Sequence, residues 1–72
     1  MRYGAVYDVG DWATFDPSAY AVRFHARLAA EGVTAVGTGG LPPGLRDCWH
    51  VGAVRLVKRG MRVRCDADVV RV

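Results

Sequence analysis

Near the C-terminal end of the chain, apolar and charged residues alternate without a break over residues 61–69. Successive side chains of a β-strand point to opposite faces of a sheet, so this pattern predicts a strand with one buried face and one face in water. Residues 54–57 (Val-Arg-Leu-Val) predict a partner strand, with Lys58-Arg59-Gly60 as the turn between the two. These segments are expected to form an antiparallel hairpin.

A helix is predicted from Pro17 to residue 31. Asp16 can accept hydrogen bonds from the first free backbone N–H groups, and Pro17 suits the first helical position, where a missing N–H costs nothing. Gly32 supplies the left-handed residue that commonly ends a helix. Arg23 and Arg27, one turn apart, are expected to face water. The residues expected to face the core recur at helical spacing and are Tyr20, Ala21, Phe24 and Leu28.

The remaining segments predict further strands. Residues 2–9 alternate in polarity, and residues 33–38 are rich in β-branched side chains. A third strand is expected to enter at residues 47–51, with Gly52 as a β-bulge, before the final hairpin. The order β-α-β-β-β predicts an α+β fold, in which one helix packs on one face of a mixed, mostly antiparallel sheet. The strands joined through the helix are expected to run parallel, and the opposite sheet face is left without a cover.

Size and composition narrow the class of protein. The chain has 72 residues, of which 51% are hydrophobic, which predicts one small folded domain over residues 1–72. No apolar run reaches the roughly 18 residues of a membrane span, and the N-terminal segment has no signal-peptide core. Two cysteines are too few for a disulfide scaffold. We therefore expect a soluble cytoplasmic protein that completes its small core as a homo-oligomer and does not contact membranes.

Positive charge is concentrated in the second half of the chain. Residues 1–36 hold three arginines and four acids, a balance of −1, whereas residues 37–72 hold seven basic residues and three acids, a balance of +4. Nine of the ten basic residues are arginines. A GC-rich genome explains this bias as well as a function does, because arginine codons are GC-rich. The net charge of +3 is compatible with polyanion binding without requiring it.

The predicted hairpin collects several of these cations on one side. If Arg59 and Gly60 are the two central turn residues, Arg55 falls directly opposite Arg64, and these charges repel unless an anion or an acid lies beside them. Asp66, diagonal to Arg55, is the acid within reach. The pattern indicates either an ordinary solvated strand face or a surface for phosphate contacts with nucleic acid or another polyanion. The candidate residues for that surface are Arg55, Lys58, Arg59, Arg62 and Arg64.

A protein partner is the alternative hypothesis. The uncovered sheet face needs water, another subunit or a ligand against it, and tryptophan is enriched where proteins bind one another. Tryptophan and proline are also present in the segments flanking the predicted strands. The candidate partner-binding residues are Trp12, Trp49, Leu41, Pro42 and Pro43. In this hypothesis the protein is an inhibitor, an adaptor or a subunit of an assembly.

A distant third hypothesis is a metal-dependent phosphodiesterase that uses Asp8 and Asp11. Both follow the first predicted strand, and paired carboxylates are suited to Mg²⁺. The segment 7–11 resembles the end of the first strand in a family of small, ferredoxin-like CRISPR-associated proteins, and the resemblance implies a metal and nuclease activity at a dimer interface. The rest of the chain departs from that family, because no second helix is evident and no basic stretch precedes the helix. A turn rich in Asp, Gly and Trp is the plainer interpretation.

Other reactive residues do not form a recognisable site. Cys48, His50 and Cys65 do not have the short spacing of a structural zinc site, and the fourth ligand would have to be His25 or an aspartate, so zinc is not expected. A Cys48–His50 nucleophilic pair would lack an orienting group and a pocket. Cys65 is expected in the apolar face, and His25 is expected to be a partly buried packing residue.

The glycine-rich residues 37–40 precede prolines instead of a helix, so a phosphate-binding loop is not predicted. We expect no cofactor, no metal and no catalytic residue.

Overall fold

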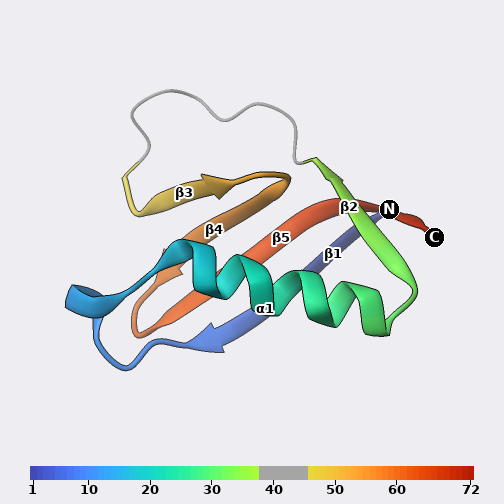
Figure 1. The fold of residues 1–72 in the computed structure, drawn as a ribbon. Coiled ribbons are helices and arrows are strands. Elements are labelled where there is room, and N and C mark those ends of the chain that lie inside the picture. The colour runs from blue at the N-terminus through green and yellow to red at the C-terminus, as the bar shows by residue number, and fades with distance from the viewer. Residues whose placement is uncertain (38–45) are drawn as a thin grey trace.

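The structure is a computed structural model that describes residues 1–37 and 46–72. Its helices are the short 3-10 helix η1 (Trp12–Thr14) and the α-helix α1 (Pro17–Ala30). Its strands are β1 (Arg2–Asp8), β2 (Val33–Gly37), β3 (Cys48–Val51), β4 (Val54–Arg59) and β5 (Arg62–Arg71). Figure 1 shows α1 crossing one face of the sheet that these strands form. The predicted α+β class, with one helix on a mostly antiparallel sheet, is confirmed.

The central strand of the sheet is β5. It pairs antiparallel with β1 and with β4 over the same residues, so these two strands lie on its opposite edges. Asp68 of β5 pairs with Arg2 of β1 and also with Gly37 of β2, so β2 lies on the side of β5 opposite β1. On that side, β4 pairs with the first half of β5, and β2 pairs with the second half. The outer strand β3 pairs with β4. Because β1 and β2 are both antiparallel to β5, they run in the same direction, as expected, with β5 between them.

Both hairpin turns begin with a glycine. Gly52 and Ala53 connect β3 to β4, Gly60 and Met61 connect β4 to β5, and the glycines have φ values of 58° and 61°. Tight hairpin turns need a positive φ at their first central residue, which glycine adopts at no steric cost. Two predictions are therefore wrong. Gly52 is no bulge but opens a turn that separates two strands, and a turn centred on Arg59 and Gly60 would have forced a positive φ on the arginine.

The turn position changes the pairing of β4 with β5. Arg55 lies opposite Asp66, and Arg59 lies opposite Arg62, so the predicted Arg55–Arg64 pair does not form. The observed register differs from the predicted one by two residues. Since side chains alternate with a period of two, this difference keeps every residue on its predicted face and changes only its cross-strand neighbour.

The helix begins and ends where the sequence predicts. The Asp16 side chain accepts a hydrogen bond from the Ser18 backbone N–H at 3.0 Å, and Pro17 is the first helical residue. Gly32, just past the C-cap, has a φ of 75°, which suits glycine. The predicted inward residues are confirmed as well: Ala21, Phe24 and Leu28 are buried, and Tyr20 is half-buried.

The core lies between α1 and the helix side of the sheet. Phe24 and Leu28 pack there against alternate residues of the strands, so each strand contributes one of its two faces. The buried apolar residues of the strands are Ala5 from β1, Val33 from β2, Val54 and Leu56 from β4, and Val63, Cys65, Ala67 and Val69 from β5. No helix of the described residues packs on the opposite face.

Some predictions concern residues 38–45. Leu41, Pro42, Pro43 and most of the glycine-rich segment 37–40 lie outside the described residues. Within the described part of the chain, no helix is long and apolar enough to cross a membrane.

Candidate functional site

The sheet face opposite α1, called the open face below, carries most of the charged side chains of the strands. Strand alternation places five arginines and three aspartates there, interspersed with valines. The residues of the open face on β1, β4 and β5 are Arg2, Gly4, Val6 and Asp8 from β1, Arg55, Val57 and Arg59 from β4, and Arg62, Arg64, Asp66, Asp68 and Val70 from β5. It is the only strand face among the described residues on which no helix packs.

Asp66 is the centre of the charge network on the open face. Only 2% of this residue is exposed, although it lies on the side without a helix. Arg55 donates two hydrogen bonds to its carboxylate, from Nε at 3.0 Å and from Nη2 at 2.9 Å. Arg64 Nε lies 3.8 Å from the same carboxylate. The two guanidinium groups cover Asp66, so Arg55 is held by a carboxylate instead of being available to a phosphate.

Arg64 also lies against β1. A Cβ atom at Gly4 would be 3.5 Å from Arg64 Nη2, so the absence of a side chain at this position leaves the guanidinium next to the strand backbone. The Arg64 side chain remains about half exposed. It is therefore both a neighbour of Asp66 and accessible to a ligand on the open face.

Two further ion pairs connect β1 to β5. Arg62 Nε donates to Asp8 Oδ1 at 3.1 Å, and Arg2 Nε lies 3.4 Å from Asp68 Oδ1. All four side chains are at least about half exposed. Ion pairs this exposed contribute little to stability, because water and salt screen them. Because these ion pairs are weak, a phosphate or another anion can compete with Asp8 and Asp68 for the two arginines.

Positive charge is least compensated at the β4–β5 turn. Arg59 and Arg62 are directly opposite each other and exposed, and among the described residues Arg59 has no ion-pair partner. Lys58, predicted to contribute to this group from the tip of the turn, points to the helix side, where its Nζ lies 4.8 Å from the centroid of the Trp12 ring. The structure therefore brings Arg59, Arg62 and Arg64 together on the open face, fixes Arg55 against Asp66, and places Lys58 elsewhere.

The two tryptophans form an aromatic cluster on the helix side. The rings of Trp12 and Trp49 are nearly parallel, with centroids 6.1 Å apart, and Phe15 lies within 4.9 Å of both. Trp12 Nε1 also donates to the Gly60 carbonyl at 3.0 Å, which ties the cluster to the β4–β5 turn. Both tryptophans are half-buried. Their packing gives them a structural role, whatever they contact on their exposed edges.

Asp8 and Asp11 have partners of their own. Asp8 pairs with Arg62, and Asp11 accepts a hydrogen bond from the Ala13 N–H at 2.9 Å as the N-cap of η1. Among the described residues no group of three or more His, Cys, Asp or Glu side chains is arranged to hold a metal ion. The observed geometry explains the two aspartates as an ion pair and a helix cap.

The cysteines and histidines are dispersed. Both cysteines are free; Cys65 lies in the core, as predicted, and Cys48 is half-buried on β3. Burial raises the pKa of the Cys65 thiol to about 11, so this thiol is protonated and poorly nucleophilic at neutral pH. His50 lies opposite Arg55 at the edge of the open face. His25 is exposed, so the prediction that it is a partly buried packing residue is wrong.

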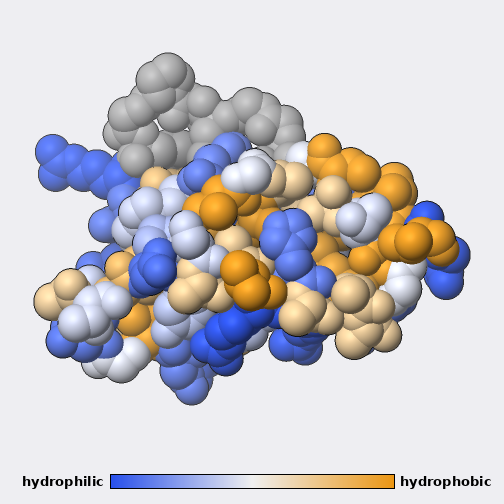
Figure 2. Space-filling model, in the orientation of Figure 1, coloured by the Kyte–Doolittle hydropathy of each residue, from blue (hydrophilic) through white to orange (hydrophobic). Residues whose placement is uncertain are grey.

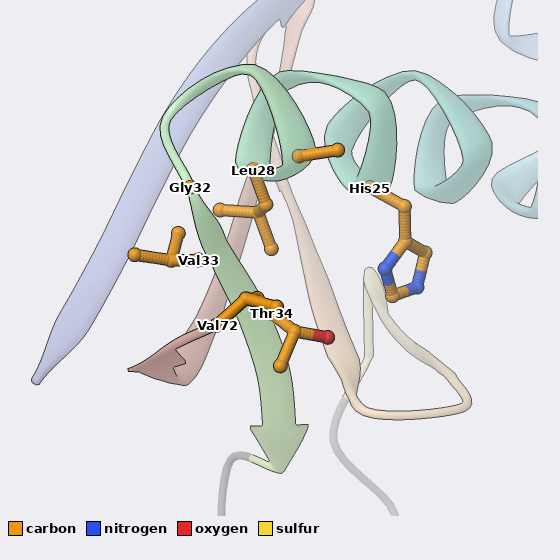
Figure 3. A pocket seen from close by; sticks show the side chains of 7 residues that line it. His25, Leu28, Gly32, Val33, Thr34 and Val72 are labelled. Carbon is orange, nitrogen blue, oxygen red and sulfur yellow. The ribbon is translucent and has the colours of Figure 1, made fainter.

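A shallow hollow of about 440 Å³ lies between the C-terminal half of α1 and β2. Figure 3 shows His25 at one side of it, with Leu28, Val33 and Thr34 among the other side chains that line it. Figure 2 shows apolar surface gathered toward the end of the molecule where β2 and the C-terminus lie. The hollow is lined by His25, Leu28, Ala29, Gly32, Val33, Thr34 and Val72, none of which the sequence marks as a site residue.

No protein-family model matches this chain, and no curated protein or solved structure matches it. What the protein does must therefore be inferred from its own residues.

Proposed function

We propose that this is a small intracellular, non-enzymatic binding protein that contacts a polyanion, specifically a nucleic-acid strand, through Arg59, Arg62 and Arg64 on the open face. The observation that carries the proposal is the Arg59–Arg62 cross-strand pair. Like charges directly opposite each other destabilise a sheet, and a phosphate bound between them would remove that repulsion. The intracellular assignment follows from the two free cysteines, which fit a reducing compartment.

The proposed surface is smaller than the one that the sequence predicts. Asp66 already accepts two hydrogen bonds from Arg55, and Lys58 lies over Trp12 on the opposite face. Arg59 and Arg62 remain exposed at the turn, with Arg64 one step along the same face of β5. Arginine is suited to this role because its planar guanidinium can form two parallel hydrogen bonds to a phosphate.

The test compares two double variants that each remove two positive charges. Arg59→Gln with Arg62→Gln removes the charge pair from the open face, whereas Arg23→Gln with Arg27→Gln removes two exposed charges from α1, on the other layer. Binding to labelled single- and double-stranded DNA and RNA is measured between about 50 and 200 mM salt, where phosphate contacts change affinity most visibly. Thermal melting verifies that both variants are folded.

We expect the first variant to bind more weakly and to reduce the slope of log affinity against log salt by about 2, because each lost phosphate contact lowers the slope by about 1. The α1 variant should keep the slope of the unmodified protein. Equal slopes in the unmodified protein and the Arg59/Arg62 variant would contradict the proposal, as would no binding at the lowest salt.

A protein partner is a second candidate, favoured by the exposed valines of the open face. Val6 and Val70 are 52% and 48% exposed on a face that otherwise carries ion pairs. A photo-crosslinking residue at position 70 would then give one defined adduct in cells, and the same residue at position 22, on the exposed side of α1, would not. Identical adduct patterns at the two positions would argue against a specific protein partner on this face.

A further inference from the structure

Among the described residues, strand β1 is an edge of the sheet, and half of its backbone groups are not used by another strand. The Val69 N–H donates to the Met1 carbonyl at 2.7 Å, and the Val9 N–H donates to the Met61 carbonyl at 2.9 Å. Antiparallel pairing alternates, so the odd-numbered residues of β1 direct their N–H and C=O groups toward β5. The groups of residues 2, 4, 6 and 8 consequently point away from the sheet. Of these, the Asp8 carbonyl accepts a hydrogen bond from the Tyr20 hydroxyl at 3.1 Å, and its second lone pair is left for a partner strand. Such an edge is a template for another strand.

The charges on β1 are arranged symmetrically about its middle residue. Ala5 is the centre of Arg2–Asp8, and the two end residues carry opposite charges on the open face. If a second copy of the strand runs antiparallel beside the first with Ala5 against Ala5, Arg2 of each copy lies opposite Asp8 of the other. This register also aligns the outward-pointing residues of both strands, as hydrogen-bonded pairing requires.

We propose that two copies of this chain associate by antiparallel pairing of their β1 strands, centred on Ala5, into one continuous sheet. The proposal goes beyond the proposed function and does not depend on it. The ion pairs of each copy extend across the junction, because Arg2 already contacts Asp68 and Asp8 already contacts Arg62. The row Asp68–Arg2 of one copy then continues into Asp8–Arg62 of the other, with charges alternating in sign throughout.

Other pairings of the free edges lack this complementarity. A parallel β1 pair in register would set Arg2 beside Arg2 and Asp8 beside Asp8, and like charges opposite each other are unfavourable. An antiparallel pair shifted by two residues no longer sets Arg2 opposite Asp8. A shift in one direction places Arg2 opposite Val6, and a shift in the other direction places Asp8 opposite Gly4. Of the other strands with an outer edge in the described part of the chain, β2 and β3 are shorter than β1 and have no acidic residue. The charge pattern therefore selects one edge and one register.

The size of the contact sets the expected affinity. Two paired seven-residue strands bury less than the roughly 1,200 Å² of a typical stable interface, so we expect a reversible dimer that dissociates on dilution. Pairing within one sheet keeps both open faces on the same side, and α1 of each copy on the other. The arginines near the two β4–β5 turns would then belong to one extended surface.

The decisive experiment uses two charge-reversal variants, Arg2→Glu and Asp8→Lys. Each variant alone would place like charges opposite each other at both ends of the junction, so sedimentation equilibrium should show a dissociation constant raised by about tenfold or more. In a one-to-one mixture, the reversed charge of each variant meets its complement in the other. The mixture should therefore recover dimers to within about threefold of the unmodified protein, which also shows that both variants fold.

A backbone substitution tests the hydrogen bonds separately from the charges. Val6→Pro removes an outward-pointing N–H that β5 does not use, so the fold should persist while dimerisation is lost. Val6→Thr keeps the N–H and is the matched control, which should dimerise normally. A protein that stays monomeric at millimolar concentration would overturn the proposal. So would a dimer that is indifferent to Val6→Pro, or single charge variants that associate as well as their mixture.

Discussion

At the scale of single residues, Asp66 and Asp68 show how context separates two identical side chains. Both lie on the open face of β5, two positions apart. Asp66 is almost fully buried and accepts two hydrogen bonds from Arg55, whereas the Asp68 side chain is 49% exposed and lies 3.4 Å from Arg2. The buried carboxylate is shielded from water by the two arginines that neutralise it. Its charge therefore matters to stability far more than the charge of its neighbour.

The pair provides a matched test of stability. Asp66→Asn should lower the free energy of unfolding by about 2 kcal/mol, because hydrogen bonds to a charged group are lost and the half-buried Arg55 guanidinium is left without its counter-charge. Asp68→Asn should lower it by less than about 0.5 kcal/mol, as for other exposed pairs. Urea unfolding of both variants measures the difference. Equal losses would mean that Asp66 is not held in the bidentate arrangement.

At the scale of elements, local chemistry fixes where each segment begins and ends. The side chain of Asp16 satisfies a backbone N–H of the first helical turn, and glycines open both hairpin turns because those positions need a positive φ. The glycine rule is visible in the sequence, and applying it to Gly60 would have given the correct register. The prediction of an Arg55–Arg64 pair was wrong because it placed Gly60 second in the turn, and this local rule explains the error without any tertiary interaction.

The helix cap can be tested against the smaller cap of η1. Asp16→Ala should lower the free energy of unfolding by about 1 kcal/mol, because it leaves an N–H of the 14-residue helix α1 without its partner. Asp11→Ala should cost less than about 0.5 kcal/mol, since η1 has three residues and Trp12 is anchored separately through Gly60. Thermal or urea unfolding measures both. A larger effect for Asp11→Ala would show that η1 supports the fold more than its length suggests.

At the scale of the whole molecule, β5 holds the sheet together. It pairs with β1 along one edge, and with β4 and then β2 along the other, so the backbone of this strand is hydrogen-bonded on both sides. Its inward residues also form a large part of the core under α1. By contrast, within residues 1–37 and 46–72, β3 pairs with β4 alone and has one edge without a strand beside it.

This arrangement predicts an order of amide exchange. Amides of residues 63–69 should exchange with deuterium most slowly, since their release requires opening of the whole sheet. Amides of β3, in an outer strand of four residues, should exchange faster. Exchange followed by NMR at low protein concentration measures both strands in one sample. Protection in β3 equal to that in β5 would mean that the outer strand is held by a contact outside the described residues.

The whole molecule also determines what the open face can offer a partner. In the described part of the chain only α1 packs on the sheet, so the opposite face stays open to water and is largely polar. The ion pairs of the open face make it polar. They also neutralise most of its arginines, so that uncompensated positive charge remains only near Arg59 and Arg62. The candidate site is thus the part of a solvated face in which charge compensation is incomplete.

The sequence by itself determined the helix, its ends and the face of each strand residue, because capping chemistry and side-chain periodicity act over a few neighbouring residues. It identified the cations of the hairpin without identifying their partners. Only the tertiary structure decided that Asp66 holds Arg55, that Lys58 lies over Trp12, and that β1 is a free edge. These features depend on which strands meet and in which register, and that is set by contacts between residues far apart in the chain.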